Sequence, residues 1–181
     1  VEALCARAAV VLEQMTADAN PQVRANAIEG LAELPQRLEV VVHRALTDPN
    51  IGVRSTAALM VGRMELKSCI GSVKPLTRDA SPFVVASALY ALTKCGENVD
   101  LTPLATMLMT DPSTRVRAHA AYLLGELREV SAAGLLRDAS RASMPKAQAL
   151  EYRLMQLQIA EALVKLGEDS QLETIRAALY P

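Results

Sequence analysis

Residues 110–127 read TDPSTRVRAHAAYLLGEL and carry the pattern that decides the fold. Asp111 opens the pattern, and Ser113 follows at a position typical of a helix N-cap, where a hydroxyl accepts a hydrogen bond from the first turn. Apolar residues then recur at helical spacing, at Val116, Ala120, Ala121, Leu124 and Leu127. The stretch therefore predicts an amphipathic helix near 113–128 that begins after an aspartate-containing turn.

The same pattern occurs three times earlier in the chain. Residues 18–34, 48–64 and 79–95 align with 111–127 without gaps. The valine that they share steps from Val23 to Val53, Val84 and Val116, which gives a period of 30 to 32 residues. A degenerate fifth copy is expected at 155–167, and shorter amphipathic segments lie between the copies. Self-similarity at this period predicts an array of helix pairs.

Each pair should consist of a shorter first helix and a second helix that carries the repeated pattern. We expect second helices near 20–34, 50–65, 81–95, 113–128 and 148–166. First helices are expected near 3–16, 37–47, 67–77, 102–110, 131–140 and 170–180. Pro75 should kink or stop its first helix, and Pro145 is expected to break a helix in the polar stretch 138–151. Residues 1–181 are thus predicted to form a single repeat domain.

The predicted array starts on a first helix and ends on one, neither end has a polar cap, and the chain begins with Val1 rather than methionine. We therefore expect a fragment of a longer chain, with other domains of that parent chain as neighbours.

Composition limits the classes of function. The chain is 51% hydrophobic but 3% aromatic with no Trp, which favours closely packed helices over a sandwich or barrel. Nineteen basic against 20 acidic residues give a net charge of −1, so no nucleic-acid partner is expected. No apolar run approaches the roughly 18 residues needed to span a membrane. The cysteines Cys5, Cys69 and Cys95 lack CxxC spacing, which is typical of free thiols and favours a cytoplasmic location.

The repeated pattern resembles HEAT repeats, in particular the short HEAT-like type first described in phycobilisome lyases. The residues that carry the resemblance are Asp18, Val23, Arg24, Leu31, Asp48, Val53, Arg54, Ala57, Ala58, Gly62, Asp111, Val116, Arg117, Ala120, Ala121, Leu124 and Gly125. The resemblance implies an all-α fold, a right-handed α-solenoid of about five helix hairpins. First helices would lie on its convex face, and second helices would line its concave face. The family contains scaffolds, adaptors and a few enzymes, so the resemblance alone does not select a function.

Three aspartates stand six residues before an arginine, in the pairs Asp18/Arg24, Asp48/Arg54 and Asp111/Arg117. The arginines could form an anion-binding ladder, or each aspartate could accept hydrogen bonds from arginines of its own or the adjacent repeat. The resemblance implies the second interpretation, a structural ladder between repeats. In the third copy Val85 replaces the arginine, so Asp79 must pair with Arg78 or Arg54 or face water. We expect any weak joint of the ladder there.

A row of side chains outside the predicted core could bind a partner. Helical spacing places Leu59, Tyr90 and Tyr122 at equivalent positions of three second helices, where they would form an apolar strip. Arg63, Lys94 and His119 are close in sequence to the strip and would orient the partner. The alternative is that both tyrosines half-bury against the next repeat.

No pattern in the sequence supports catalysis. His43 and His119 are isolated and lack the spacing of metal ligands, so we expect no metal site, no catalytic residues and no cofactor. Neither His43 nor His119 is followed by glutamate, which the resembling di-iron hydroxylases require, and the charge balance disfavours the resembling DNA glycosylases. We therefore expect a scaffold that binds a protein partner. The alternatives are a bilin-lyase-like protein that handles a prosthetic group, and a spacer or regulatory arm of a larger protein.

Overall fold

The chain folds into paired helices in a computed structural model that describes residues 2–144 and 147–179. The first helices are α1 (Glu2–Met15), α3 (Pro35–Ala45), α5 (Ile70–Val73), α7 (Thr102–Thr110), α9 (Ala133–Arg141) and α11 (Leu172–Leu179). The second helices are α2 (Pro21–Gly30), α4 (Ile51–Arg63), α6 (Pro82–Lys94), α8 (Thr114–Glu126) and α10 (Ala149–Lys165). Short 3₁₀ helices join several of them, and the described residues form no strand. The predicted all-α solenoid class is confirmed.

The repeated aspartate bonds the N-cap residue at the start of α2, α4, α6 and α8, and the N-cap side chain accepts a further bond in α2, α4 and α8. Asp48 Oδ1 accepts a hydrogen bond from the Asn50 amide at 2.8 Å, and Asn50 Oδ1 accepts from the Gly52 amide at 2.9 Å. The aspartates of the other copies accept in the same way from Asn20, Ser81 and Ser113. These bonds satisfy amides that have no partner inside the helix, which is why each second helix begins where the pattern predicts.

Two elements differ from the expected helices. The α-helical part of α2 ends at Gly30, and the segment Leu31–Glu33 is a 3₁₀ helix rather than the last turn of the expected helix 20–34. The first helix expected over 67–77 is interrupted, because α5 spans only Ile70–Val73 between 3₁₀ helices at Lys67–Cys69 and Lys74–Arg78. Pro75 cannot donate a backbone hydrogen bond, which explains why α5 stops just before it. Pro145 lies outside the described residues.

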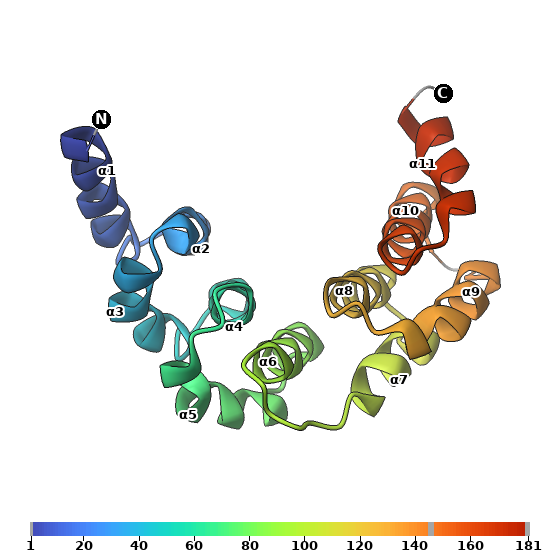
Figure 1. Cartoon of the computed structure of the whole chain (residues 1–181), viewed down its shortest axis with the longest axis horizontal. Coiled ribbons are helices and arrows are strands. Elements are labelled where there is room, and N and C mark those ends of the chain that lie inside the picture. Colours follow the sequence, from blue (N-terminus) through green and yellow to red (C-terminus); the bar gives the residue numbers. More distant parts are fainter. Residues whose placement is uncertain (1, 145–146, 180–181) are drawn as a thin grey trace. The chain divides into compact units, whose positions relative to one another are not determined.

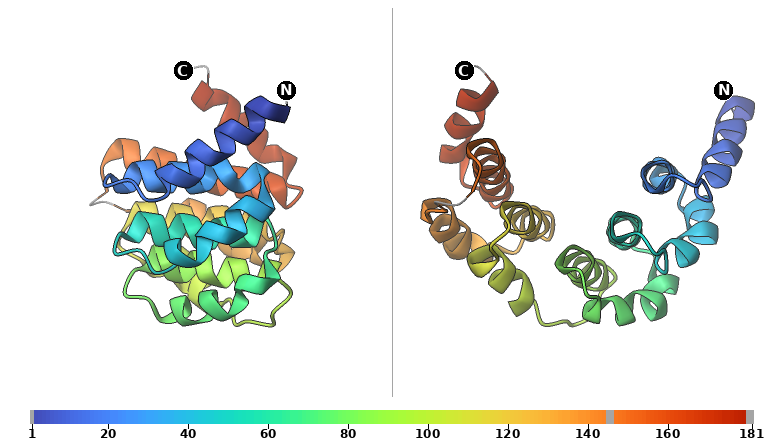
Figure 2. Two further views of the ribbon diagram at one scale, coloured as in Figure 1. Left: turned by 90° about the vertical axis from the view of Figure 1, so that its left-hand side faces the viewer. Right: turned by 180° about the vertical axis from the view of Figure 1, so that it is seen from behind.

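The chain divides into two compact units, one up to Val99 and the other from Asp100. In unit 1, α2, α4 and α6 lie side by side in one layer, and α1, α3 and α5 form the other layer (Figures 1 and 2). In unit 2, α8 packs on α10, and α7, α9 and α11 supply the second layer (Figure 1). The prediction of one domain over 1–181 stays a prediction, and the two units are described separately.

Small residues let the second helices approach closely within each unit. A Cβ atom on Gly62 of α4 would lie 2.6 Å from the Tyr90 ring and 2.8 Å from the Ala91 Cα atom, both on α6. A Cβ atom on Gly125 of α8 would lie 2.9 Å from the Ala162 Cα atom of α10. Alanines at equivalent positions of four second helices are all buried, namely Ala27, Ala57, Ala88 and Ala120. The core therefore uses close backbone contact where other proteins use aromatic rings.

Candidate functional site

Two arginines of unit 1 each join consecutive repeats. Arg24 donates from Nε and Nη2 to the two carboxylate oxygens of Asp48, at 2.8 and 2.7 Å. Its Nη1 donates to the carbonyl oxygens of Asp18 and Ala19 in its own turn, at 2.9 and 3.1 Å. The two charged side chains are only 14% and 12% exposed, so the pair is largely shielded from water. This geometry is that of a structural ladder, because one guanidinium bonds both the aspartate of the next repeat and the backbone of its own turn.

Arg54 repeats the same set of bonds one period later. It donates from Nε and Nη2 to Asp79 at 2.9 and 3.0 Å, and from Nη1 to the carbonyl oxygens of Asp48 and Pro49. Of the two partners considered for Asp79, the structure selects Arg54. The hydrogen bonds from Arg24 and Arg54 hold the pKa values of Asp48 and Asp79 below their ordinary range, and backbone amides lower both further.

The ladder changes in the later copies. Arg117 donates from Nε to the carbonyl oxygen of Asp111 in its own turn, at 2.6 Å. In α10 the equivalent position holds Gln156, whose buried Nε2 donates to no acceptor among the described residues. Position 85 holds valine, which cannot donate, and the boundary after Val99 falls in that repeat. The shielded bidentate carboxylate–guanidinium pairs are therefore seen in unit 1, whereas in unit 2 the exposed Arg115 of α8 donates to Glu151 of α10 at 2.9 Å.

The predicted partner-binding residues of unit 1 differ in exposure. Arg63 is exposed near the end of α4, and Lys94 forms an ion pair with Glu65 at 3.4 Å. Leu59 is partly buried against the core of unit 1. Tyr90 is only 2% exposed, because its ring fills the space above Gly62. Its ring is covered by the preceding second helix, so it is unsuited to the expected role of a surface anchor.

The predicted residues of unit 2 lie in a compact cluster. The rings of His119 and Tyr122 are stacked, with centroids 6.4 Å apart and an angle of 27° between their planes. Lys165 of α10 places its Nζ atom 5.4 Å from the centroid of the Tyr122 ring. The same Nζ donates to Glu126 at 2.6 Å and to Glu161 at 2.7 Å. We call these five residues the α8–α10 patch.

Sequence reasoning missed Lys165 and Glu161. Residues 161–166 align with residues 29–34 of the first copy. This alignment places Glu161 at the position of Tyr122 and Lys165 at the position of Glu126, so the fifth copy did contain the information. Burial lowers the pKa of Lys165, but the hydrogen bonds to the two glutamates outweigh burial and raise it. Lys165 therefore stays charged beside the Tyr122 ring, where a cation is attracted by the ring face.

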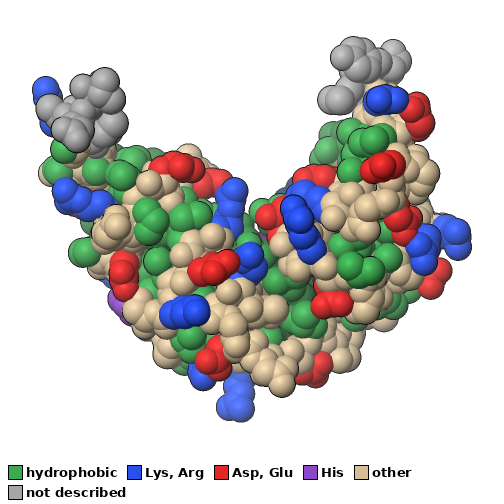
Figure 3. Space-filling model, in the orientation of Figure 1, with side chains coloured by type: hydrophobic (Ala, Val, Ile, Leu, Met, Phe, Trp, Pro, Cys, Tyr) green, Lys and Arg blue, Asp and Glu red, His purple; other side chains and the backbone are tan. Residues whose placement is uncertain are grey.

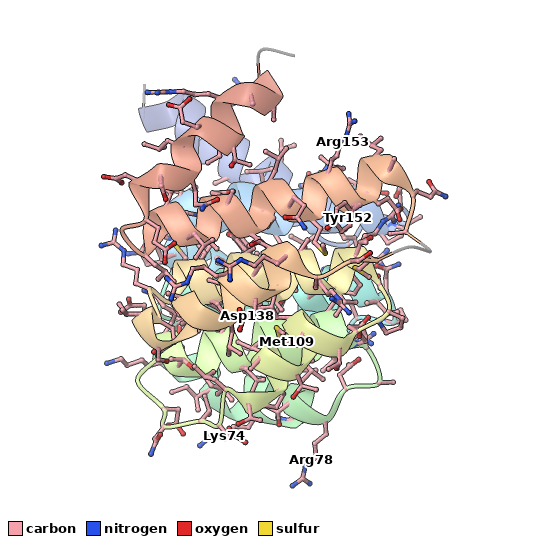
Figure 4. All side chains as sticks on the ribbon, turned by 90° about the vertical axis from the view of Figure 1, so that its right-hand side faces the viewer. Lys74, Arg78, Met109, Asp138, Tyr152 and Arg153 are labelled. Carbon is pink, nitrogen blue, oxygen red and sulfur yellow. The ribbon has the colours of Figure 1, made fainter. Side chains whose placement is uncertain are left out.

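An apolar groove of about 460 Å³ lies next to this patch. Its lining comes from three helices of unit 2, namely Ala118 of α8, Leu154, Leu157, Gln158 and Glu161 of α10, and Ile175 and Ala178 of α11. Near the start of α10, Tyr152 donates from its hydroxyl to the carbonyl oxygen of Ala142 at 3.0 Å, and Arg153 extends away from the helix (Figure 4). The Tyr152 bond fixes the first turns of α10, which carry Leu154.

Charges of both signs are mixed on the surface. On the face shown in Figure 3, Lys and Arg side chains are interspersed with Asp and Glu in each unit. Among the described residues, no group of three or more His, Cys, Asp or Glu side chains could hold a metal ion. No described helix is both long and apolar enough to cross a membrane.

The buried thiols have no reactive environment. Cys69 and Cys95 are free and buried, and burial raises the pKa of both thiols. The Cys69 Sγ atom lies 3.8 Å from His43 Nε2, while His43 Nδ1 is 2.9 Å from Ser72 Oγ. A nucleophilic cysteine needs a lowered pKa, so this pair does not resemble a catalytic dyad. The Cys5 side chain lies outside the described residues.

A family model described as HEAT repeats matches the chain twice, over residues 8–93 and 38–125. The two matches overlap, and together they cover more than half of the sequence. No curated protein matches the chain.

Proposed function

Because the chain belongs to the HEAT repeat family, whose members usually mediate protein interactions, we propose that it is a non-catalytic scaffold that binds a protein partner on its second helices. The observation that carries this proposal is the α8–α10 patch, which combines an aromatic ring, an imidazole and charged groups on one surface of unit 2.

The contacts inside the patch favour binding with little loss of freedom. Tyr122 is partly buried between His119 and Lys165, and Lys165 is fixed by two carboxylates. These side chains are already ordered before a partner binds, so binding costs less side-chain conformational entropy. Tyrosine is also among the residues that contribute most at protein interfaces.

Unit 1 offers a candidate surface of its own. Arg63 is exposed, Lys94 is 33% exposed beside Glu65, and Leu59 is partly buried against the core of unit 1. Tyr90 is left out because it is buried. Interspersed charge of both signs supports a protein partner rather than a polyanion, which would require a basic surface. The bilin-handling and spacer alternatives stay predictions, as does the cytoplasmic location.

The test replaces His119 and Tyr122 together by alanine and compares the proteins captured from cells of the source. The matched control is Arg141→Ala, a truncation of a 75% exposed side chain on α9 of the same unit. We expect the double variant to lose its specific partner by about tenfold or more, since interface tyrosines often contribute over 1 kcal/mol each. The control should retain it, and circular dichroism should show both variants folded. An unchanged partner set in the folded double variant would refute the proposed surface.

A further inference from the structure

The helices α4, α6, α8 and α10 end in the same backbone motif, and two of them place a charged residue where glycine is favoured. In each, the amide two residues beyond the C-cap bonds the carbonyl oxygen five residues earlier. The residue between has a positive φ, which is 90° at Gly96 and 93° at Gly167 but 50° at Glu65 and 53° at Arg128. Glycine adopts this left-handed backbone freely, whereas a residue with a Cβ atom is strained by it. Glu65 and Arg128 therefore cost stability that the two glycines do not.

Glu65 is the less favourable of the two charged residues. Its carboxylate lies at the C-terminus of α4, where the helix dipole disfavours negative charge, whereas Arg128 brings the favoured sign to the end of α8. In return Glu65 forms an ion pair with Lys94 at 3.4 Å, and the two side chains are 54% and 33% exposed. An exposed pair of this kind contributes little to stability. A strained residue that its own contacts do not repay indicates a functional role.

Three cations lie close to Glu65 at the ends of α4 and α6. Arg63 and Lys94 occupy equivalent positions of these adjacent helices, and Lys67 follows Glu65 by two residues. Arg63 and Lys67 are exposed, and neither forms an ion pair with a described residue. After burial, which has the largest effect, the pKa of Cys95 at the C-cap of α6 is raised by Glu65 and lowered by Lys67. Both charges therefore lie beside the end of α6.

The other charges nearby are engaged or belong to neighbouring elements. Glu97, just beyond the end of α6, forms an ion pair with Lys74 at 2.8 Å. Glu39 of α3 accepts a hydrogen bond from Ser68. Glu33 lies in the 3₁₀ helix that follows α2. The ends of α4 and α6 thus carry an excess of positive charge, and these last two acids bound it on the sides of α3 and α2.

This surface is open for a reason that is internal to the repeats. In unit 1, α4 is flanked by α2 on one side and by α6 on the other, and α3 also packs against it (Figures 1 and 2). Stacked repeats cover the flanks of a second helix, whereas the loop at its end stays at the edge of the stack. The loop that carries Glu65 therefore stays accessible even though α4 has a neighbour on each flank.

We propose that the ends of α4 and α6 bind a segment of the partner protein that carries aspartate or glutamate, and that Glu65 holds Lys94 until a partner carboxylate takes its place. The exposed side chains of Arg63 and Lys67 then bond further carboxylates of the same segment. The inference rests on the proposed scaffold function and names the chemistry of the partner segment for unit 1. A carboxylate that must first be displaced also raises specificity, because weakly acidic segments do not replace it.

The experiment titrates the whole isotope-labelled chain with a short synthetic peptide of consecutive glutamates. Two control peptides carry glutamine or lysine in place of the glutamates. Chemical shifts of the backbone amides of residues 63–67 and 94–97 report binding at this surface and yield its dissociation constant. We expect these amides to shift with the glutamate peptide and to stay unchanged with both controls.

Variants of Glu65 separate its charge from its backbone strain. Glu65→Gln and Glu65→Gly should each tighten binding of the glutamate peptide about two- to fivefold, the range that corresponds to an exposed ion pair. Only Glu65→Gly should also raise the urea midpoint, because only glycine relieves the left-handed backbone. The matched control is Glu173→Gln, which removes a 77% exposed carboxylate of unit 2 and changes the net charge equally. It should bind as the unchanged chain does.

Two further variants test the placeholder role. Lys94→Met should weaken binding of the glutamate peptide, and in that chain Glu65→Gln should tighten it less, because no ion pair is left to release. Arg128→Gly relieves the same backbone strain in unit 2, so it should raise the urea midpoint without tightening binding. Circular dichroism should show all variants folded.

The following outcomes would overturn the inference. Equal shifts with the glutamine peptide, or with the lysine peptide, would refute the acidic partner segment. An unchanged affinity in Glu65→Gln, or the same gain in the Lys94→Met chain, would refute the placeholder. Absent peptide binding together with a partner that the His119 and Tyr122 variant loses would remove this inference alone. Peptide binding together with captured proteins that do not depend on His119 and Tyr122 would instead remove the proposed α8–α10 patch.

Discussion

The two units use the same repeat, but they place their charged side chains differently. In unit 1, Arg24 and Arg54 are each fully engaged between turns, and their aspartate partners are only 12% and 10% exposed. In unit 2, Arg117 bonds its own turn, while Lys165 joins two glutamates on the exposed row beside Tyr122. Charged pairs join consecutive repeats in both units, but those of unit 1 are shielded from water, whereas Lys165–Glu126 and Arg115–Glu151 of unit 2 lie on the surface.

The same repeat pattern therefore supports two arrangements of charged side chains, a shielded pair and an exposed network. A shielded bidentate pair holds two repeats in register, because both of its hydrogen bonds break if the turns move apart. The network around Lys165 lies where a partner can reach it, with side chains 25% to 48% exposed. Variants that weaken one kind of contact and spare the other should therefore affect the two units unequally.

The largest expected effect comes from adding one methyl group at the close helix contacts. Gly62→Ala would bring Cβ within 2.8 Å of the Ala91 backbone and still closer to the Tyr90 ring, whereas Gly125→Ala meets the Ala162 Cα atom at 2.9 Å. Overpacking costs about 1–3 kcal/mol, and we expect Gly62→Ala in the upper part of that range and Gly125→Ala below it. Urea unfolding followed by circular dichroism measures both.

Gly134→Ala is the matched control for these two variants. Gly134 lies inside α9, and a Cβ atom there would meet nothing within 4 Å. Alanine should stabilise this helix by about 0.5–1 kcal/mol, because glycine loses more backbone freedom on folding. A larger loss for Gly125→Ala than for Gly62→Ala would contradict the geometry of the two contacts.

A smaller effect is expected from removing one ladder arginine in each unit. Arg54→Met takes away four hydrogen bonds and leaves the Asp79 carboxylate without its cation, so we expect a loss of about 1–2 kcal/mol. Arg117→Met removes a bond to its own turn, and the loss should be smaller. Denaturant unfolding compares the two, with Arg63→Met as an exposed control. Equal losses at positions 54 and 117 would show that the bond between repeats adds nothing.

The smallest expected effect is on how the free energy of unfolding changes with pH, through Asp48 and Asp79 of unit 1. The folded-state pKa values of Asp48 and Asp79 are lowered chiefly by Arg24 and Arg54. A lowered pKa gives stability that is present above the unfolded value of about 4 and is lost as pH falls through the folded value. The free-energy difference between the unchanged chain and Asp79→Asn should therefore be constant from neutral pH to about 4 and shrink below it.

Unfolding in urea at a series of pH values measures this difference. Arg63→Met, an exposed substitution outside the ladder, supplies the reference slope. A difference for Asp79→Asn that does not change with pH would mean that the carboxylate charge contributes nothing to the contact.

The sequence was sufficient for the fold because the first four copies carry the same local signals. The aspartate, the N-cap and the apolar positions after Val23, Val53, Val84 and Val116 place the second helices, and those signals act within a few residues. The interruption of α5 at Pro75 was also foreseen as a kink or stop, although the shortness of α5 was not.

The site was less predictable because exposure depends on the neighbouring helix. Tyr90 and Tyr122 occupy equivalent positions, yet Tyr90 is buried where Gly62 leaves room for its ring. The helical wheel of α6 alone cannot contain that information, since the space belongs to α4. Lys165 was not predicted as a site residue because the fifth copy is degenerate. The groove was not predicted because part of its lining comes from α11, which lies outside the repeated pattern.

Each ladder arginine of unit 1 pairs with the aspartate of the following repeat, and this affects how the chain can gain or lose repeats. The carboxylate that pairs with Arg24 belongs to the aspartate that opens the next repeat, while the Nη1 atom of Arg24 bonds carbonyl oxygens of its own turn. If a genetic deletion removed residues 48–78, Asp79 would follow Arg24 at the separation that Asp48 has now, and the pair would form again. Duplication of the same segment would likewise supply one new donor with one new acceptor. This repeat can thus be gained or lost without leaving a charge unpaired, whereas a cut that removed Asp48 but not Arg54 would leave the Arg24 guanidinium without its carboxylate.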